Sequence, residues 1–390
     1  MGRPVALEPS TAMGRDTAVT ATALLQQLVA IDSVNPTIVA GGSGEAEIAA
    51  FVARWLERAG LDVALQEAAP GRPNVIGRAR GSRPGATLVF NAHMDTVGVA
   101  GMSDPHRPRI EGDRLYGRGA YDMKAGLAAI MLVGAAAIEE RFAGEVVVTA
   151  VADEEAFSIG TERLVRDLRA DAAIVTEPTA LDIVVAHKGF AWAEVETHGF
   201  AAHGSRYDLG VDAIAKMGEV LRRLGDLEER LAASPTRHPL LGRGSVHSST
   251  ITGGQEISSY PESCRLALER RTLPGEDGVA AEIASLADGL DGEARVTFVR
   301  QPLETSPDAR IVLTLTAAAT AAGRTPDLVG EHGWADAGLF GAAGIPACLY
   351  GPGGAGAHEV VEWADLRQLE QAVTVLQTTA RDFCSAATAF

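Results

Sequence analysis

Residues 86–96 read Ala-Thr-Leu-Val-Phe-Asn-Ala-His-Met-Asp-Thr, an apolar run that turns polar at its carboxyl end. The part from 87 to 91 is rich in strand-forming residues and predicts a buried β-strand. His93 and Asp95 stand two residues apart, so in extended chain their side chains point the same way. A histidine beside a carboxylate suits a metal ligand with a supporting partner. The alternative is a polar strand end entering a loop, and this stretch alone leaves both open.

Two further apolar strands end in acidic residues. Residues 146–151 run into Asp-Glu-Glu at 153–155, and residues 172–175 run into Thr-Glu-Pro at 176–178. Strands that alternate with helices predict an α/β fold with a mainly parallel, helix-covered sheet. Such sheets bind ligands beyond the carboxyl ends of their strands. Three strand ends therefore predict one shared site, with the candidate ligands His93, Glu154, Glu155 and Glu177.

Hydrophobic periodicity and turn residues predict the remaining elements. Helices are expected at residues 17–30, 44–58, 122–140, 160–169, 211–231, 277–288, 308–322 and 363–383, and further strands at 62–66, 75–79, 191–197, 245–251, 264–270, 294–299 and 347–350, with a hairpin at 109–117. After Lys188 the order strand, helix, strand, strand, helix, strand forms a compact α+β unit. We therefore predict a catalytic metal-binding domain made of residues 1–187 and 302–390, and an inserted domain made of residues 188–301.

Composition narrows the class of protein. The chain has 390 residues, 46% hydrophobic and 22% charged, which is ordinary for a soluble globular protein and long enough for two domains. A net charge of −17 argues against nucleic acid or an anionic membrane as a partner. The sequence contains no run of about 18 apolar residues, so no membrane helix is expected. Residues 1–16 lack the apolar core of a secretory signal, so none is expected there. Three cysteines without a CxxC motif predict reduced thiols in a cytoplasmic protein.

The candidate ligands offer oxygen or imidazole donors and no thiolate: His93, Asp122, Glu154, Glu155, Glu177 and His358. Such donors suit catalytic zinc, with cobalt or manganese as alternatives. Five ligands, the number left when one of the six acts as a base, are too many for one zinc ion that keeps an open position. A carboxylate that bridges two metal ions about 3.5–4 Å apart would accommodate all five. One carboxylate must stay free to take a proton from the activated water. The adjacent Glu154 and Glu155 supply one base and one ligand.

Seven stretches, in order along nearly the whole chain, carry a resemblance to a known family. They are NAHMDTV (91–97), LYGRGAYDMKAG (115–126), ADEEAFSIGT (152–161), TEPT (176–179), HGFAAHGS (198–205), YPESCRLALERRTLPGE (260–276) and GPGGAGAHEVVE (351–362). With these motifs the chain resembles the zinc aminoacylase/carboxypeptidase family of co-catalytic metallohydrolases. That family includes acetylornithine deacetylase, succinyl-diaminopimelate desuccinylase and glutamate carboxypeptidase.

The resemblance implies a role for each matching residue of the metal centre. Asp95 resembles the carboxylate that orients the first ligand, and Asp122 resembles the bridging aspartate, with a cis peptide bond to Met123 implied. Glu154 resembles the general base. The implied zinc ligands are Glu155 and His358 for one ion, and His93 and Glu177 for the other.

Five further residues are implied to act on the substrate. His203 resembles the residue that steadies the oxyanion, in many relatives from the partner subunit. Arg271 resembles the arginine that grips the substrate's α-carboxylate. Two places depart from the family pattern. Ser258 stands where many relatives have asparagine, and Trp334-Ala335-Asp336 replaces a commoner Gly/Thr/Ser-Asp pattern. Both departures are expected to alter how the substrate is held.

The resemblance implies a cytoplasmic, two-zinc hydrolase with a homodimer formed through the inserted domain, which also serves as a lid. Its expected reaction removes the acyl group of an N-acyl amino acid by a metal-bound hydroxide, with Glu154 as general base. Dipeptidase or carboxypeptidase action is the alternative. A metal-binding or peptide-binding relative without catalysis is a remote one, because it requires a lost base or ligand and every expected one is present.

Overall fold

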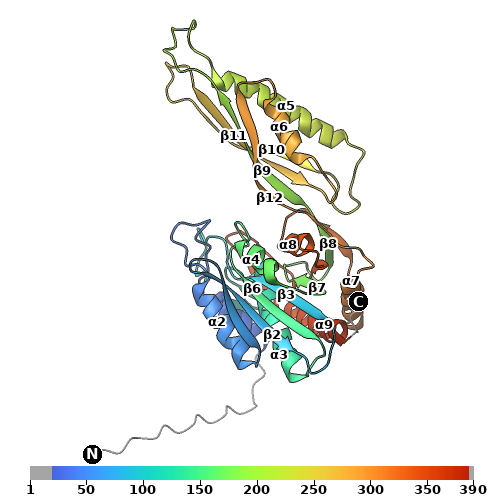
Figure 1. Cartoon of the computed structure of the whole chain (residues 1–390). Helices are drawn as coiled ribbons and strands as arrows, with labels where there is room; N and C mark the ends of the chain where they lie inside the picture. Colours follow the sequence, from blue (N-terminus) through green and yellow to red (C-terminus); the bar gives the residue numbers. More distant parts are fainter. Residues whose placement is uncertain (1–19, 386–390) are drawn as a thin grey trace, which may run out of the picture.

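The computed structural model describes residues 20–385. The prediction for residues 1–16 and the predicted helix start at residue 17 therefore lie outside the described residues. Figure 1 shows a lower body, in which helices pack on a large sheet, and an elongated upper body whose helices lie on one face of a second sheet. The chain passes upward where β8 (Ile183–His187) leads into β9 (Gly189–His198), and it returns after β12 (Gly292–Arg300).

The large sheet confirms the predicted α/β architecture. Its strands lie in the order β1-β2-β6-β3-β7-β15-β8-β13, with β14 beside β8. The central strands β6, β3, β7 and β15 run parallel, whereas the pairs β1–β2, β2–β6, β15–β8 and β8–β13 are antiparallel. The bounds are β1 Asp62–Ala69, β2 Arg72–Arg80, β3 Thr87–His93, β6 Glu145–Val151, β7 Ala172–Val175, β13 Leu303–Glu304, β14 Leu328–Glu331 and β15 Ala347–Leu349.

Helices cover both faces of this sheet. Strand β3 shows the division, because Leu88 and Phe90 join one hydrophobic cluster and Val89 joins another, as a side-chain period of two requires. The first cluster contains α1 (Ala21–Val29), α2 (Ala46–Arg58), α3 (Ala125–Glu139), α7 (Arg310–Ala321) and α9 (Leu366–Ser385), and the second contains α4 (Ile159–Asp167) and α8 (Ala337–Ala342). The site at the strand ends is thus built on a core packed from both sides.

Helix α3 is the central helix of the first cluster. A Cβ atom added at Gly126 would lie 2.1 Å from the carbonyl oxygen of Thr176, so only glycine allows this close approach. Among residues 20–385, the segment 120–139 is the one helix long and apolar enough to cross a membrane, and 67% of that window is buried inside the fold. Its apolar character therefore reflects packing in the protein core.

Two predicted helix starts are wrong, and both lie beside the site. The helix predicted to open at Asp122 begins at Ala125, because Asp122 and Met123 have non-helical backbone angles that form a kink within Ala120–Lys124. The peptide bond between Asp122 and Met123 is cis, as the resemblance implied. The last helix begins at Leu366 rather than at Trp363, because residues 363–365 form strand β17.

A small sheet joins two distant segments of the chain. Its order is β16-β17-β5-β4, with β4 Arg109–Glu111, β5 Arg114–Tyr116, β16 Gly354–Ala355 and β17 Trp363–Asp365. Strands β4 and β5 are the predicted hairpin, and Gly112 in its turn has the left-handed φ of 58°. Because β17 pairs with β5, the loop that carries His358 is brought beside the segment that carries Asp122.

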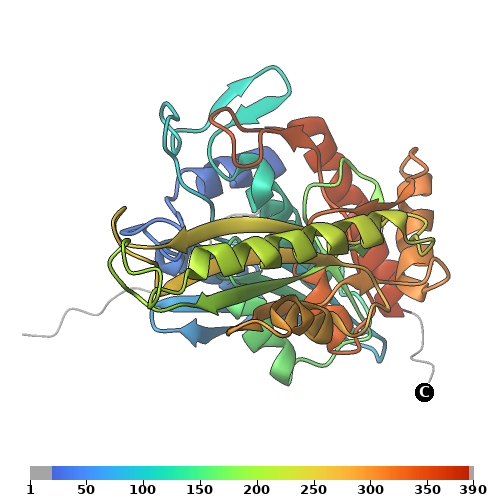
Figure 2. The same ribbon diagram turned by 90° about the horizontal axis from the view of Figure 1, so that it is seen from above.

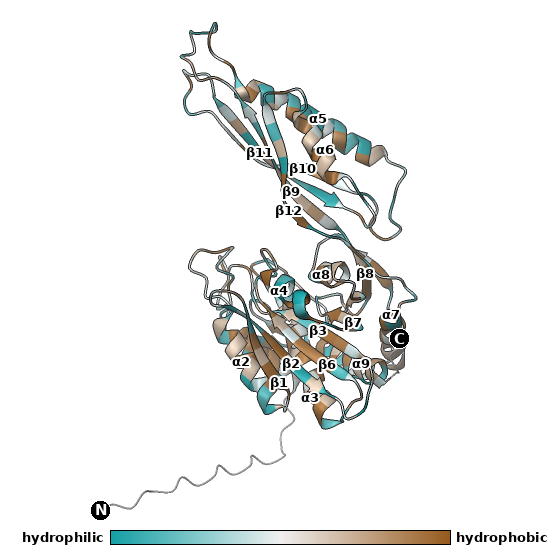
Figure 3. Ribbon diagram, viewed as in Figure 1, coloured by the Kyte–Doolittle hydropathy of each residue, from teal (hydrophilic) through white to brown (hydrophobic). Residues whose placement is uncertain are grey.

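The second domain is a four-stranded antiparallel sheet in the order β10-β11-β9-β12, with β10 Ser245–Gly253 and β11 Ser263–Thr272. Helices α5 (Ala213–Ala233) and α6 (Val279–Ala284) share its hydrophobic cluster, which confirms the predicted βαββαβ order. Figure 2 shows α5 lying along this sheet. In Figure 3 the strands of the large sheet are mostly brown and those of the second sheet mix teal and brown. The helices and strands of this domain lie between residues 189 and 300. The predicted domain boundaries at residues 188 and 301 stay a prediction.

Candidate metal centre

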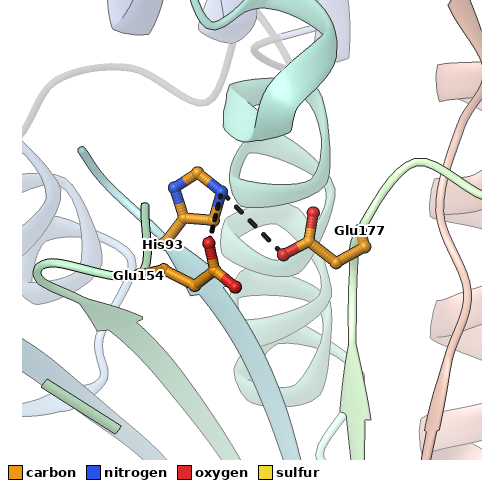
Figure 4. Close-up of side chains that lie close together, drawn as sticks. All are labelled: His93, Glu154 and Glu177. Atoms are coloured by element: carbon orange, nitrogen blue, oxygen red, sulfur yellow. Dashed lines mark ion pairs between the residues drawn. The ribbon is translucent and has the colours of Figure 1, made fainter. Parts of the chain in front are cut away.

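Three neighbouring parallel strands deliver the central side chains. His93 is the last residue of β3, Glu154 lies three residues after β6, and Glu177 lies two residues after β7. The carboxyl ends of parallel strands meet at one edge of a sheet. The Nε2 atom of His93 accordingly lies 4.0 Å from a carboxylate oxygen of Glu154 and 3.8 Å from one of Glu177 (Figure 4).

Asp122 connects this group with a second one. Its Oδ1 lies 3.2 Å from Nε2 of His93, and its Oδ2 lies 3.5 Å from Nε2 of His358. His358 in turn lies 2.9 Å from a carboxylate oxygen of Glu155. One carboxylate therefore presents one oxygen to each of two donor groups, which is the arrangement that a bridging ligand needs. The distances alone leave Glu154 able to act as ligand or as base.

Burial makes this cluster electrostatically costly. It raises the pKa of Glu154 well above its ordinary value, and the charge of Glu177 raises it further. Burial raises the pKa of Glu177 in the same way. Burial alone would also raise the pKa of Asp122, but hydrogen bonds with His358 and His93 hold it below its usual range. Hydrogen bonds with Asp122 and Glu155 raise the pKa of His358 to about 10.

The donor atoms of the site are placed as metal ligands would be. Two groups, His93 with Glu154 and Glu177, and His93 with Asp122 and Glu155, each place their donor atoms within 4.8 Å of one another. The buried Oε1 of Glu155 has no hydrogen-bond partner among the described residues. Crowded, partly unpaired carboxylates with imidazoles are a donor set for divalent cations. The residues therefore fit the pair of metal ions that the sequence predicted.

Asp95 supports the site through both its backbone and its side chain. Nδ1 of His93 lies 2.9 Å from the backbone carbonyl oxygen of Asp95 and 3.6 Å from its carboxylate. The Asp95 carboxylate accepts hydrogen bonds from the backbone N–H groups of Glu154 and Glu155, each at 3.1 Å. Asp95 thus contacts the first ligand and also the loop that carries the predicted base.

Sequence reasoning missed several residues that hold this loop and the Asp122 turn. Asn35 donates to Asp95 at 2.7 Å and to Asp153 at 3.1 Å, and Arg72 donates to Asp153 at 3.0 Å. The sequence around Asn35 gave no signal of this role, because a local motif says nothing of a distant partner.

Glu362 is the other missed support. Its buried carboxylate accepts hydrogen bonds from the backbone N–H groups of Gly119, Tyr121 and Asp122 at 2.9–3.1 Å. The guanidinium of Arg118 pairs with the same carboxylate at 2.6 Å. Glu362 lies in one of the seven matching stretches, four residues after His358. That position was the only indication in the sequence that Glu362 belongs near the site.

A cleft of about 560 Å³ lies over the metal centre. Arg271 and Trp334 line it together with five of the six candidate ligands, Asp122, Glu154, Glu155, Glu177 and His358, so the structure brings these predicted residues together. Asp336 is instead buried behind the wall, where its carboxylate accepts a 2.6 Å hydrogen bond from Thr161. Burial raises the pKa of Asp336 to about 6.

His203 and Ser258 are not brought to this cleft within the chain. They lie on adjoining loops of the second domain, where Gly204 donates its N–H to the carbonyl of Ser258 at 2.6 Å. Nδ1 of His203 lies 2.8 Å from the hydroxyl of Ser205, and the side chain of His203 is exposed. Neither residue lines the cleft over the metal centre. Their expected roles at the site therefore stay predictions.

Comparisons with known proteins show the family of the chain. Residues 89–382 match the family described as Peptidase family M20/M25/M40. An acetylornithine deacetylase of Myxococcus xanthus is 30% identical over 93% of this chain and 97% of its own length. An N-formyl-4-amino-5-aminomethyl-2-methylpyrimidine deformylase of Bacillus subtilis is 29% identical over 87% of this chain and 89% of its own length. A dinuclear metal binding peptidase of the M20 family, also from Bacillus subtilis, has the same fold. Its TM-score is 0.70 at 16% identity, with 93% of this chain and 97% of that chain covered.

Proposed function

This chain belongs to peptidase family M20/M25/M40, and on that premise we propose that it hydrolyses the amide bond of an N-acyl amino acid with two divalent metal ions. The observation that carries the proposal is Asp122, whose two carboxylate oxygens face His93 and His358 at 3.2 and 3.5 Å. A relative named as a deacetylase and another named as a deformylase, both similar over most of the chain, support an acyl group as the part removed.

The proposed ligands divide the site into two halves. His93 and Glu177 would hold one ion, Glu155 and His358 the other, and Asp122 would be shared. The donor set favours zinc, with cobalt or manganese able to substitute. When bound, two such ions would supply Lewis-acid chemistry that polarises the amide carbonyl and lowers the pKa of the attacking water.

The remaining chemistry belongs to side chains of the cleft. Glu154 takes the proton of the attacking water and passes it to the nitrogen of the leaving amine. Arg271 pairs with the substrate's α-carboxylate, and Glu269 fixes its Nε at 2.7 Å while its other N–H groups stay available. Trp334 lines the cleft and limits the size of the acyl group or side chain. His203 of a partner subunit donates to the developing oxyanion.

The proposed setting is a cytoplasmic homodimer formed through the second domain. Cys264, Cys348 and Cys384 are all buried and free, in keeping with reduced thiols. Dipeptidase or carboxypeptidase action is the second candidate, because the family is described as a peptidase family. The same cleft and the same base would serve a peptide bond.

A substrate panel tests the proposal. Protein stripped of metal is assayed with N-acetyl, N-formyl and N-succinyl amino acids and with dipeptides, each with added zinc, cobalt or manganese. We expect the N-acyl compounds to be hydrolysed faster than the dipeptides, and only after a metal is added. Faster cleavage of dipeptides would favour the second candidate. Two bound metals without hydrolysis of any compound would favour a binding protein.

A further inference from the structure

The loop that carries the proposed base has unusual backbone angles at both ends. Asp153, directly before Glu154, has a φ of 68°, and Ser158 has a φ of 54°. Left-handed angles are uncommon for residues other than glycine, and they persist where surrounding contacts hold them. The catalytic domain supplies such contacts on one side, through Asp95 and Arg72. The position of Glu154 therefore depends on what holds this loop.

The second domain holds the same loop from the other side. Arg300, the last residue of β12, donates from Nη2 to the backbone carbonyl of Phe157 and, at 3.1 Å, to the carboxylate of Glu162 in α4. Arg300 is only 7% exposed. Its guanidinium carbon lies 4.4 Å from the ring centroid of Phe298 and 5.7 Å from that of Trp334. A guanidinium fixed by rings and by two acceptors is a stiff connection between the domains.

The ring of Phe157 makes a second connection. It lies edge-on to Phe298 and Trp192, with ring centroids 5.4 and 5.9 Å apart. Phe298 pairs with Trp192, and Arg300 pairs with Phe190, two positions further along the β12–β9 ladder, so both pairs lie on the same face. Side chains of directly opposed residues share one face of a sheet. The contacts to the loop thus come from one end of one sheet face.

We propose that Arg300 and Phe157 form a clasp through which the second domain positions the loop that carries Glu154. The clasp rests on the proposed function in that Glu154 is the base to be positioned. Arg300 acts through the backbone of Phe157 and does not touch the substrate. Because Arg300 also lines the cleft, the competing assignment is a substrate-binding guanidinium. The two assignments predict different kinetics.

The test uses the full-length, zinc-loaded protein with Arg300→Met, Arg300→Lys and Phe157→Leu. The matched control is Arg295→Met, which removes an arginine from the same strand that pairs with Glu194 at 2.8 Å. Two readouts are measured: amide hydrogen exchange of residues 152–162, and kcat and KM on the substrate that the proposed panel identifies. Exchange needs no turnover, so it reports on the clasp even if the proposed reaction is wrong.

For Arg300→Met we expect exchange in residues 153–158 to rise about tenfold, since a lost contact lowers the cost of local opening. We also expect kcat to fall about 10- to 100-fold, as misplaced catalytic groups do, with KM changed little. Phe157→Leu should act in the same direction, Arg300→Lys should recover part of both losses, and Arg295→Met should match the unmodified protein.

Two results would overturn the clasp. Unchanged exchange in both Arg300→Met and Phe157→Leu would show that the second domain does not hold the loop. A raised KM with kcat and exchange unchanged would make Arg300 a substrate-binding residue instead. If Arg300→Met fails to fold, Phe157→Leu carries the same test from the catalytic side of the contact. Absence of hydrolysis by the unmodified protein would count against the proposed function alone.

Discussion

The two domains treat acidic side chains in opposite ways. In the catalytic domain, Asp122, Glu154, Glu155 and Glu177 crowd around His93 with little access to water. In the second domain, acids on β9 each face an arginine across the sheet, at 2.8 Å for Glu194 with Arg295 and at 3.0 Å for Glu196 with Arg265. These pairs are exposed to solvent on their arginine side.

This difference distinguishes carboxylates expected to bind a cation from carboxylates that form exposed ion pairs. Buried carboxylates without matching cations cost folding free energy. Such a cost persists in a protein when a bound cation offsets it. Exposed ion pairs contribute about 0.2–1 kcal/mol each and require no such explanation. We therefore expect the buried cluster to serve the proposed metal ions, and the ladder of ion pairs on β9 to serve solubility and local order. Substitutions in both domains test this division.

The largest effect is expected at Glu154. Glu154→Gln should lower kcat by about 10²–10⁴-fold, because general base catalysis contributes that much, while both metals stay bound. The same change should raise the melting temperature of metal-free protein, since it removes a carboxyl group whose ionisation burial and the neighbouring Glu177 oppose. Glu194→Gln is the matched exposed control. Turnover near the unmodified rate in Glu154→Gln would remove this residue from the mechanism.

His203 is an exception to this division, because it lies in the second domain and is proposed to act at the metal centre of a partner subunit. His203→Ala should lower kcat by about 10²–10³-fold, the usual cost of losing an oxyanion donor. Mixing His203→Ala with Glu154→Gln subunits should restore part of the activity, since one of the two sites then has both groups. No recovery, with subunit exchange confirmed by mass spectrometry, would rule out action across subunits.

Glu362 tests whether the buried supports of the catalytic domain tune metal binding. Glu362→Gln weakens the hydrogen bonds to Gly119, Tyr121 and Asp122, so metal affinity should fall about 10–100-fold, as for other residues that orient ligands. Competition with a chromophoric chelator measures the change. Glu359→Gln, on the same loop and exposed, is the control. Equal affinities in the two variants would contradict the assigned support.

The smallest effect is expected on the second sheet. Arg295→Met or Glu194→Gln should change the free energy of unfolding by about 0.2–1 kcal/mol and leave metal affinity unchanged, because the pair is exposed. Urea titration followed by tryptophan fluorescence measures the first quantity. A loss of several kcal/mol would mean that the surface ladder supports the fold as strongly as the buried cluster does.

The site residues at the strand ends were predictable, because each lies at or shortly after its strand in the sequence. His93, Glu154 and Glu177 could be located in this way, and so could the βαββαβ order of the second domain. Asn35 and Arg300 could not, since their partners Asp95 and Phe157 lie 60 and 143 positions away. Strands β8 and β14 were missed for a related reason. Pairing defines them, and their short sequences carry no clear period.

Metal titration coupled to turnover tests the central claim most directly. Protein stripped by a chelator is titrated with zinc while bound metal and hydrolysis of an N-acyl amino acid are followed together. The paired donor groups around Asp122 predict no activity without metal, two bound ions per chain, and one bound ion in the variant Glu155→Gln. Saturation at a single ion, or hydrolysis that survives the chelator, would contradict a two-metal amide hydrolase.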